Sequence, residues 1–302
     1  MSLFDRAVVR LLPAVPRPVV QRLSSPYIAG DSLDEARRTV ASLNAEGKLA
    51  TVDVLGEEVT RQDEAEAIAD AYHDVLAALD GDGLDGNISV KLTGLGLKLD
   101  LGLCRALLTS LVEDAARRST FVRVDMEDSS CTDDTLALYR VLRGEGYENV
   151  GVVLQAYLKR TMHDIAELAP LRPNVRLCKG IYVEPASIAF QEDEVVRRSF
   201  GSCLDALLEA GCYIGVATHD EHVIRYALGR VTGMSPLEYE LQMLLGVRER
   251  RAAELVAAGH RLRVYVPFGQ RWYEYSLRRL QENPKVAGYV ARDVAARLLP
   301  GR

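Results

Sequence analysis

The sequence lacks several features, and each absence excludes a class of protein. No apolar run approaches the ~18 residues of a transmembrane helix, so no membrane-spanning segment is predicted. The five cysteines are odd in number and form no CxxC pair, which indicates neither a disulfide framework nor a zinc ribbon. The five histidines contain no HxH or HExxH motif, so we predict no metal site.

The charge balance and the cysteines indicate a location. A formal net charge of -6 at pH 7 gives no general attraction to nucleic acid or anionic lipid. Free cysteines suit a reducing cytosol. Arg6, Arg10 and Pro13 interrupt the apolar start of the chain, unlike a secretory signal. We expect a cytoplasmic protein that binds no nucleic acid, and peripheral contact with the inner face of the membrane stays open.

Short β-type runs alternate with longer segments of helical period along the chain. The runs are rich in Val, Ile and Leu, as expected for strands buried on both faces. Helices are expected near 101–118, 132–146, 160–170, 190–210, 220–232, 246–259 and 270–282. The eight runs are LATVDVLGE, NISVKLTG, FVRVDMED, VGVVLQAY, NVRLCKGIY, YIGVATHD, LEYELQML and LRVYVPFG.

Eight alternating β/α units within 302 residues predict an α/β protein with one closed parallel barrel of the (βα)8, or TIM, type. We expect residues 1–45 to form an N-terminal helical arm, in which Ser32 and Glu35 make a capping box. Residues 46–302 would be the barrel and catalytic domain. LEYELQML is the weakest strand, and could equally be a helix.

Active sites of such barrels lie at the carboxyl ends of the strands. Nearly every β-type run of this chain ends on a residue that can do chemistry. The candidate site residues at these ends are Glu57, Lys91, Asp125, Gln155, Arg176, Lys179, Tyr182, His219, Gln242 and Tyr265.

Opposite charges at the ends of two neighbouring runs, Lys91 and Asp125, should pair because an unpaired buried charge is costly. A structural ion pair and a functional pair explain this spacing equally well. Lys91 could also form a Schiff base, but that use needs a lowered pKa, which a neighbouring Asp opposes.

The fifth run carries two cations three residues apart across its strand end, Arg176 and Lys179, with Gly180 and Tyr182 beside them. They suit an anionic ligand or a cofactor that becomes anionic on reduction, although a solvated strand end is the simpler interpretation. Buried Gln155 could bind a cofactor or only the neighbouring backbone.

Two further motifs lie in the second half of the chain. The run THDEH places Thr218 near a helix N-terminus, where phosphate would be favoured, and His219 against a cofactor. In RRLQE, Arg278 and Arg279 lie within helical reach of Glu282. Such a face is usually solvated, but over the barrel mouth two arginines could grip a carboxylate.

Six motifs in order, SVKLTGLG, VRVDMED, QAYLKR, VRLCKGIY, ATHDEH and YVPFG, resemble the proline dehydrogenase family. The similarity runs from LGE (55–57) to RRLQEN (278–283), and the length resembles the small monofunctional bacterial members. The resemblance implies a distorted (βα)8 barrel with extra N-terminal helices and a last helix over the mouth. It implies oxidation of L-proline to Δ1-pyrroline-5-carboxylate, with FAD as hydride acceptor and a quinone as final oxidant.

The same resemblance implies roles for individual residues. Arg278 and Arg279 would bind the proline carboxylate, with Glu282 steadying them. Glu57 would pair with the first arginine and close the site. The proline pocket would include Lys91, Asp125, Tyr182 and Tyr265. FAD would contact Gln155, Arg176, Lys179, Thr218 and His219, with Glu240 and Gln242 on the FAD side or structural.

One segment departs from the family pattern. Many members carry LHGMGE after the seventh strand, whereas this chain has MLLGVRERR, so fine specificity among cyclic amino acids stays open. Two other classes compete with the oxidoreductase: a Schiff-base lyase or aldolase using Lys91 or Lys179, and a non-enzymatic barrel that binds an amino acid.

Overall fold

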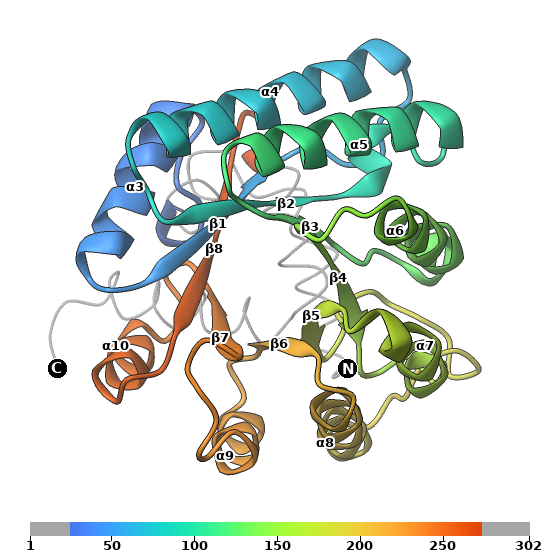
Figure 1. Ribbon diagram of the computed structural model, residues 1–302, viewed down its shortest axis with the longest axis vertical. Coiled ribbons are helices and arrows are strands. Elements are labelled where there is room, and N and C mark those ends of the chain that lie inside the picture. The colour runs from blue at the N-terminus through green and yellow to red at the C-terminus, as the bar shows by residue number, and fades with distance from the viewer. Residues whose placement is uncertain (1–24, 274–302) are drawn as a thin grey trace, which may run out of the picture.

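The computed structural model describes residues 25–273, which contain a closed barrel of eight parallel strands (Figure 1). Each strand pairs with the next in the sequence, and β8 closes the barrel against β1. The strands are β1 (Leu49–Val54), β2 (Gly86–Val90), β3 (Val122–Val124), β4 (Val150–Gln155), β5 (Asn174–Cys178), β6 (Tyr213–Ala217), β7 (Tyr239–Leu244) and β8 (Leu262–Phe268).

Helices surround the barrel on its outer face (Figure 1). One of them, α3, precedes β1 and contacts both β1 and β8. It therefore covers the outer face where the helix after β8 packs in a regular barrel. The helices are α3 (Leu33–Ala45), α4 (Gln62–Gly81), α5 (Leu101–Arg117), α6 (Thr132–Gly144), α7 (Thr161–Leu168), α8 (Asp193–Glu209), α9 (Glu221–Arg230) and α10 (Glu249–Ala257). Short 3-10 turns include η3 (Leu92–Leu95) and η4 (Ser129–Cys131).

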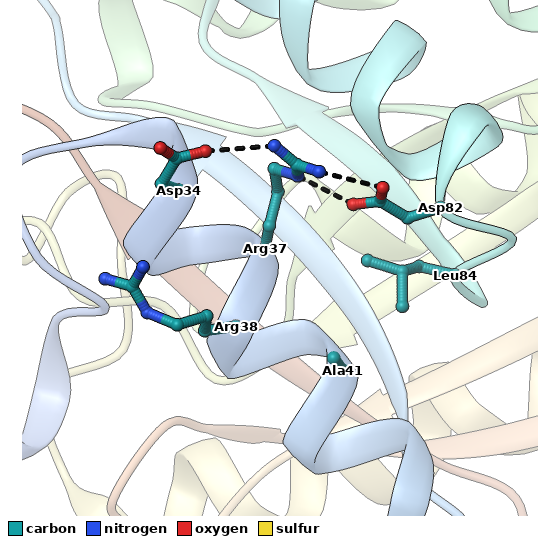
Figure 2. Close-up of a pocket in the computed structure, with 6 residues that line it drawn as sticks. All are labelled: Asp34, Arg37, Arg38, Ala41, Asp82 and Leu84. Atoms are coloured by element: carbon teal, nitrogen blue, oxygen red, sulfur yellow. Dashed lines mark hydrogen bonds and ion pairs between the residues drawn. The ribbon is translucent and has the colours of Figure 1, made fainter.

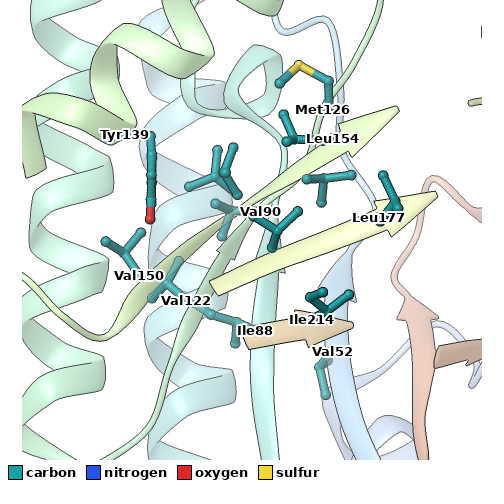
Figure 3. Packing of buried hydrophobic residues seen from close by; sticks show 14 of the residues in the cluster. Val52, Ile88, Val90, Val122, Met126, Tyr139, Val150, Leu154, Leu177 and Ile214 are labelled. Carbon is teal, nitrogen blue, oxygen red and sulfur yellow. The ribbon is translucent and has the colours of Figure 1, made fainter. Parts of the chain in front are cut away.

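The hydrophobic core lies between the strands and the helices, not inside the barrel. Val52, Ile88 and Val122 point outward from their strands and are fully or almost fully buried (Figure 3). Tyr139 of α6 packs against this layer. Because side chains alternate along a strand, the intervening residues face the barrel interior, and many of these are charged. The strands are thus apolar on the outside and polar on the inside.

The predicted (βα)8 barrel is confirmed, and the predicted elements within the described range are present with small shifts at their ends. The weakest run, LEYELQML, contributes strand β7, so its helical alternative was wrong. The capping box of Ser32 and Glu35 opens α3. Residues 1–24 of the predicted arm and the predicted helix 270–282 with its place over the mouth lie outside the described residues, apart from 270–273. No helix within 25–273 is long and apolar enough to cross a membrane.

Candidate active site

Lys91 directly follows β2 and lies in the barrel mouth, which is formed by the carboxyl ends of the eight strands. Its buried Nζ donates to Asp53 Oδ2 at 2.8 Å and to the Tyr265 hydroxyl at 2.9 Å. Carboxylate oxygens of Glu57 and Asp125 each lie 3.6 Å from Nζ. Burial by itself would lower the pKa of Lys91, but the three carboxylates raise it well above its ordinary value. A lysine held so firmly as a cation is a poor Schiff-base nucleophile, which disfavours the lyase hypothesis.

Asp125 and Arg176 form a buried ion pair inside the mouth, although β3 and β5 are not neighbouring strands. Arg176 Nη1 donates to Asp125 Oδ1 at 2.6 Å. The hydroxyls of Ser89 and Tyr265 also donate to this carboxylate, at 2.7 and 3.0 Å. Burial would raise the pKa of Asp125, but Arg176 and Lys91 bring it below the usual value. The site therefore holds an ionised carboxylate between two cations, as the sequence predicted for Lys91 and Asp125.

A second set of hydrogen bonds continues from Arg176 toward the amino end of the barrel. Arg176 Nε donates to Gln242, and the Gln242 amide donates to Glu240. Arg263 Nε donates to Glu240 Oε1 at 2.8 Å, and this contact lowers the pKa of Glu240 against the effect of burial. Because Glu240 precedes Gln242 by two residues on the inward face, it lies deeper than the mouth and supports Gln242.

The predicted cofactor residues at the carboxyl ends of β4, β5 and β6 have defined partners. Gln155 Nε2 donates to the main-chain carbonyl of Glu127 at 2.9 Å, which leaves the amide oxygen as an acceptor. Lys179 forms an ion pair with Asp220, and Asp220 also caps the N-terminus of α9. Thr218 Oγ1 accepts from the Asp220 N–H at 3.1 Å. Asp220 is thus the N-cap residue of α9, and its side chain accepts from the His222 N–H at 2.9 Å.

His219 is used internally and is not arranged as a metal ligand. Its Nε2 accepts from the N–H of the last residue of β7 at 3.0 Å. Burial, assisted by Arg248, lowers the pKa of His219 to about 4, so the ring is neutral at pH 7. Within residues 25–273, no group of three or more His, Cys, Asp or Glu side chains is placed to hold a metal ion.

Four predicted site residues remain to be placed: Tyr182, Arg278, Arg279 and Glu282. Tyr182 is half-buried in the segment after β5. Arg278, Arg279 and Glu282 lie outside the described residues, so the carboxylate clamp and its pairing with Glu57 stay predictions.

Sequence reasoning missed three residues that the fold brings to the mouth: Asp53, Ser89 and Glu127. Asp53 is fully buried and binds both Lys91 and the hydroxyl of Tyr72 from α4. A charged residue inside an apolar β-type run was the available signal for Asp53. Ser89 and Glu127 gave no signal of that kind, because their partners are distant in the sequence.

Two other features do not form part of the site. The loop GDGLDG (81–86) has the spacing GxGxxG, but it ends α4 and opens β2, whereas a Rossmann loop joins a strand to a following helix. A surface cleft of about 400 Å³ lies beside α3, away from the mouth (Figure 2). There Arg37 is paired with Asp34 and with Asp82, so its charge is already neutralised.

Taken together, the fold and the mouth define a (βα)8-barrel protein with a buried, charged site at the carboxyl ends of its strands. The profile of the proline dehydrogenase family matches residues 36–292. The chain is 37% identical to proline dehydrogenase 1 of Bacillus subtilis subsp. natto over 270 residues, which cover 89% of each chain. It is 35% identical to the proline dehydrogenase of Deinococcus radiodurans, over 97% of this chain and 98% of that one.

A solved structure supports the same fold. Proline utilization A (PutA) from Bdellovibrio bacteriovorus, inactivated by N-propargylglycine, superposes with a TM-score of 0.82 at 22% identity. The superposition covers 91% of this chain and 36% of that one, so the present chain spans little more than a third of that protein. The chain belongs to the proline dehydrogenase family, a family of oxidoreductases.

Proposed function

We propose that this protein oxidises L-proline to Δ1-pyrroline-5-carboxylate with FAD as hydride acceptor and a quinone as final oxidant. The observation that carries the proposal is the buried ion network of Lys91, Asp125 and Arg176, on residues that match family motifs. Buried charges are costly, and a barrel with a purely structural role does not need so many of them at its mouth. A binding or catalytic function accounts for them.

The proline side of the site lies around Lys91, Asp125 and Tyr265. The three are tied to one another by hydrogen bonds and ion pairs, so their positions are fixed before substrate arrives. Lys91 stays cationic and favours a carboxylate nearby. Arg278 and Arg279 would supply the bidentate contacts, and the Tyr265 ring a wall for the proline ring. Tyr182 and Glu57 complete this side of the proposal.

The cofactor side lies around Gln155, Arg176 and Lys179, with Thr218 and His219 directly after β6. Bound FAD would accept the hydride that leaves the proline ring. Arg176 uses Nε and Nη1 on Gln242 and Asp125, and no group among residues 25–273 accepts from its Nη2. These residues suit FAD, because Arg176 supplies a cation held in place and Gln155 supplies an amide oxygen that can accept a hydrogen bond.

The proposed electron acceptor is a quinone. A quinone is a lipid-soluble molecule, so its use would bring the protein to a membrane surface. The family relationship supports this acceptor, and a soluble quinone analogue in a turnover assay tests it.

The test of the function is an absorbance spectrum of the purified protein, before and after anaerobic L-proline. Flavin bands that bleach on addition of L-proline, but not of D-proline, support cofactor and substrate together. Flavin bands that persist after addition of L-proline support FAD as the cofactor and overturn L-proline as the substrate. A protein that stays colourless and inactive after incubation with FAD overturns the proposal.

A further inference from the structure

Glu127 is a buried carboxylate that the mechanism above does not use. It follows β3 by three residues and is 3% exposed. Its Oε1 accepts from the main-chain N–H of Thr93 at 2.9 Å, and its Oε2 accepts from the Thr93 hydroxyl. Both oxygens therefore accept hydrogen bonds from the same residue of the neighbouring loop.

Thr93 extends this contact to the loop after β1. Its hydroxyl oxygen accepts from the N–H of Glu58 at 3.1 Å, and its carbonyl accepts from the N–H of Val59 at 3.4 Å. At the next residue, a Cβ added to Gly94 would lie 2.3 Å from the carbonyl oxygen of Gly56. The two loops are thus in backbone contact on both sides of Glu57.

The main chain of Glu127 reaches the fourth strand as well. Its carbonyl accepts from the Gln155 side chain at 2.9 Å and fixes which end of that amide is free. The contacts of Glu127 and Thr93 therefore join the carboxyl ends of β1, β2, β3 and β4. They lie one or two residues after Glu57, Lys91 and Asp125, which contact one another in the mouth.

A set of exposed ion pairs also connects the same loops. Lys98 Nζ lies 2.8 Å from Glu58 Oε1 and 3.5 Å from Asp128 Oδ2, but all three side chains are more than a third exposed. Exposed ion pairs contribute little to stability. The buried pair of Glu127 and Thr93 is the contact that can hold the loops.

We propose that Glu127 and Thr93 are positioning residues, which hold the loop that carries Glu57 against Lys91 and fix the amide of Gln155. The inference rests on the proposed proline oxidation, because it assigns these residues to the same site. Burial raises the pKa of Glu127 to about 7 despite the two hydrogen bonds from Thr93. The protein therefore keeps a costly carboxylate at this position.

The test compares Thr93→Val, which removes the hydroxyl and keeps the side-chain volume, with Thr93→Ser, which keeps the hydroxyl. The matched control is Thr135→Val in α6, because the Thr135 hydroxyl is buried with no partner among the described residues. Two quantities are measured: amide hydrogen exchange of residues 56–60, and the KM and kcat for L-proline.

We expect Thr93→Val to speed exchange at 56–60 and raise the proline KM about tenfold, the low end for one hydrogen bond to a charged group, with a smaller change in kcat. Thr93→Ser should restore both, and Thr135→Val should change neither. Equal exchange in Thr93→Val and Thr135→Val overturns the inference whether or not the enzyme turns over. Faster exchange with an unchanged KM in an active enzyme also overturns it. A wild type that leaves proline unoxidised overturns the proposed function, and the exchange data then decide the loop contact alone.

Discussion

Replacing Asp125 by Asn should destabilise the protein strongly, because the substitution removes one charge from the centre of a buried network. Asp125 neutralises Arg176 at 2.6 Å and lies 3.6 Å from Lys91. Its side chain and those of its two partners are all about nine-tenths buried. Breaking one partner of a buried ion pair typically costs about 3–5 kcal/mol, since it leaves an uncompensated charge.

Neighbouring side chains should reduce the loss of stability in Asp125→Asn. The Asn oxygen can still accept from Arg176 and Ser89, and Asp53 still neutralises Lys91. We therefore expect about 3 kcal/mol, the lower end of the range, and a fall in Tm of roughly 5 °C for a chain of this size. The measurement is urea unfolding of the FAD-free protein at pH 7, followed by circular dichroism.

The matched control is Asp205→Asn, which makes the same chemical change at a surface pair. Asp205 lies 2.7 Å from Arg230, and the two side chains are 30% and 44% exposed. Its loss should stay below about 1 kcal/mol. If Asp125→Asn loses no more than this control, the charges of the mouth are not coupled as the distances indicate, and the argument from the network fails.

The pH dependence gives a second check on the same variant. Arg176 and Lys91 hold the folded pKa of Asp125 below its usual value against burial, so its contribution is full above the unfolded pKa of about 4. That contribution is lost as the pH falls from there through the folded pKa. The difference between wild type and Asp125→Asn should therefore be constant at neutral pH and shrink below about pH 4.

Three further outcomes are expected. Burial lowers the pKa of His219 to about 4, so between about pH 6.5 and 4 only the unfolded chain takes up a proton at this residue. The free energy of unfolding should therefore fall as the pH is lowered from about 6.5 to 4, and His219→Gln should reduce this fall in urea unfolding measured across that pH range. Gly180→Ala places a Cβ 2.1 Å from the Tyr157 ring at a φ of +108°, so we expect about tenfold weaker FAD binding in a fluorescence titration, and unchanged binding would contradict it. Arg278→Lys and Arg279→Lys should each raise the proline KM through the loss of about 2–3 kcal/mol of bidentate contact, and an unchanged KM in both would remove the clamp.

The barrel was predictable from the sequence because its signal is repeated. Eight apolar runs separated by helical segments leave few other arrangements, and one weak run does not change the outcome. LEYELQML was ambiguous by itself, since Glu240 and Gln242 interrupt its apolar pattern. In the fold these two residues face the barrel interior, where they contact each other and Arg263. A polar interior therefore produced the ambiguity.

The site was predictable in part for a geometric reason. All parallel strands end at the same edge of the barrel, so a list of strand ends is already a list of neighbours. Lys91 and Asp125 directly follow β2 and β3, and they meet Arg176 and Tyr265, which lie two and three residues before the ends of β5 and β8. The rule does not identify a residue whose contacts depend on one particular partner elsewhere in the sequence. Glu127 contacts Thr93, which lies 34 residues away, and spacing alone does not indicate such a contact.

The interior network explains how a buried arginine can be held rigidly for chemistry. Arg263 holds Glu240, Glu240 orients the Gln242 amide, and Gln242 accepts from Arg176 Nε. On the other side Asp125 binds Nη1 of the same guanidinium. With two of its nitrogens fixed from opposite sides, Arg176 cannot rotate without breaking buried charged contacts, which are costly to lose. The charges deeper in the barrel thus fix the position of the Arg176 guanidinium, as its proposed role beside the cofactor requires.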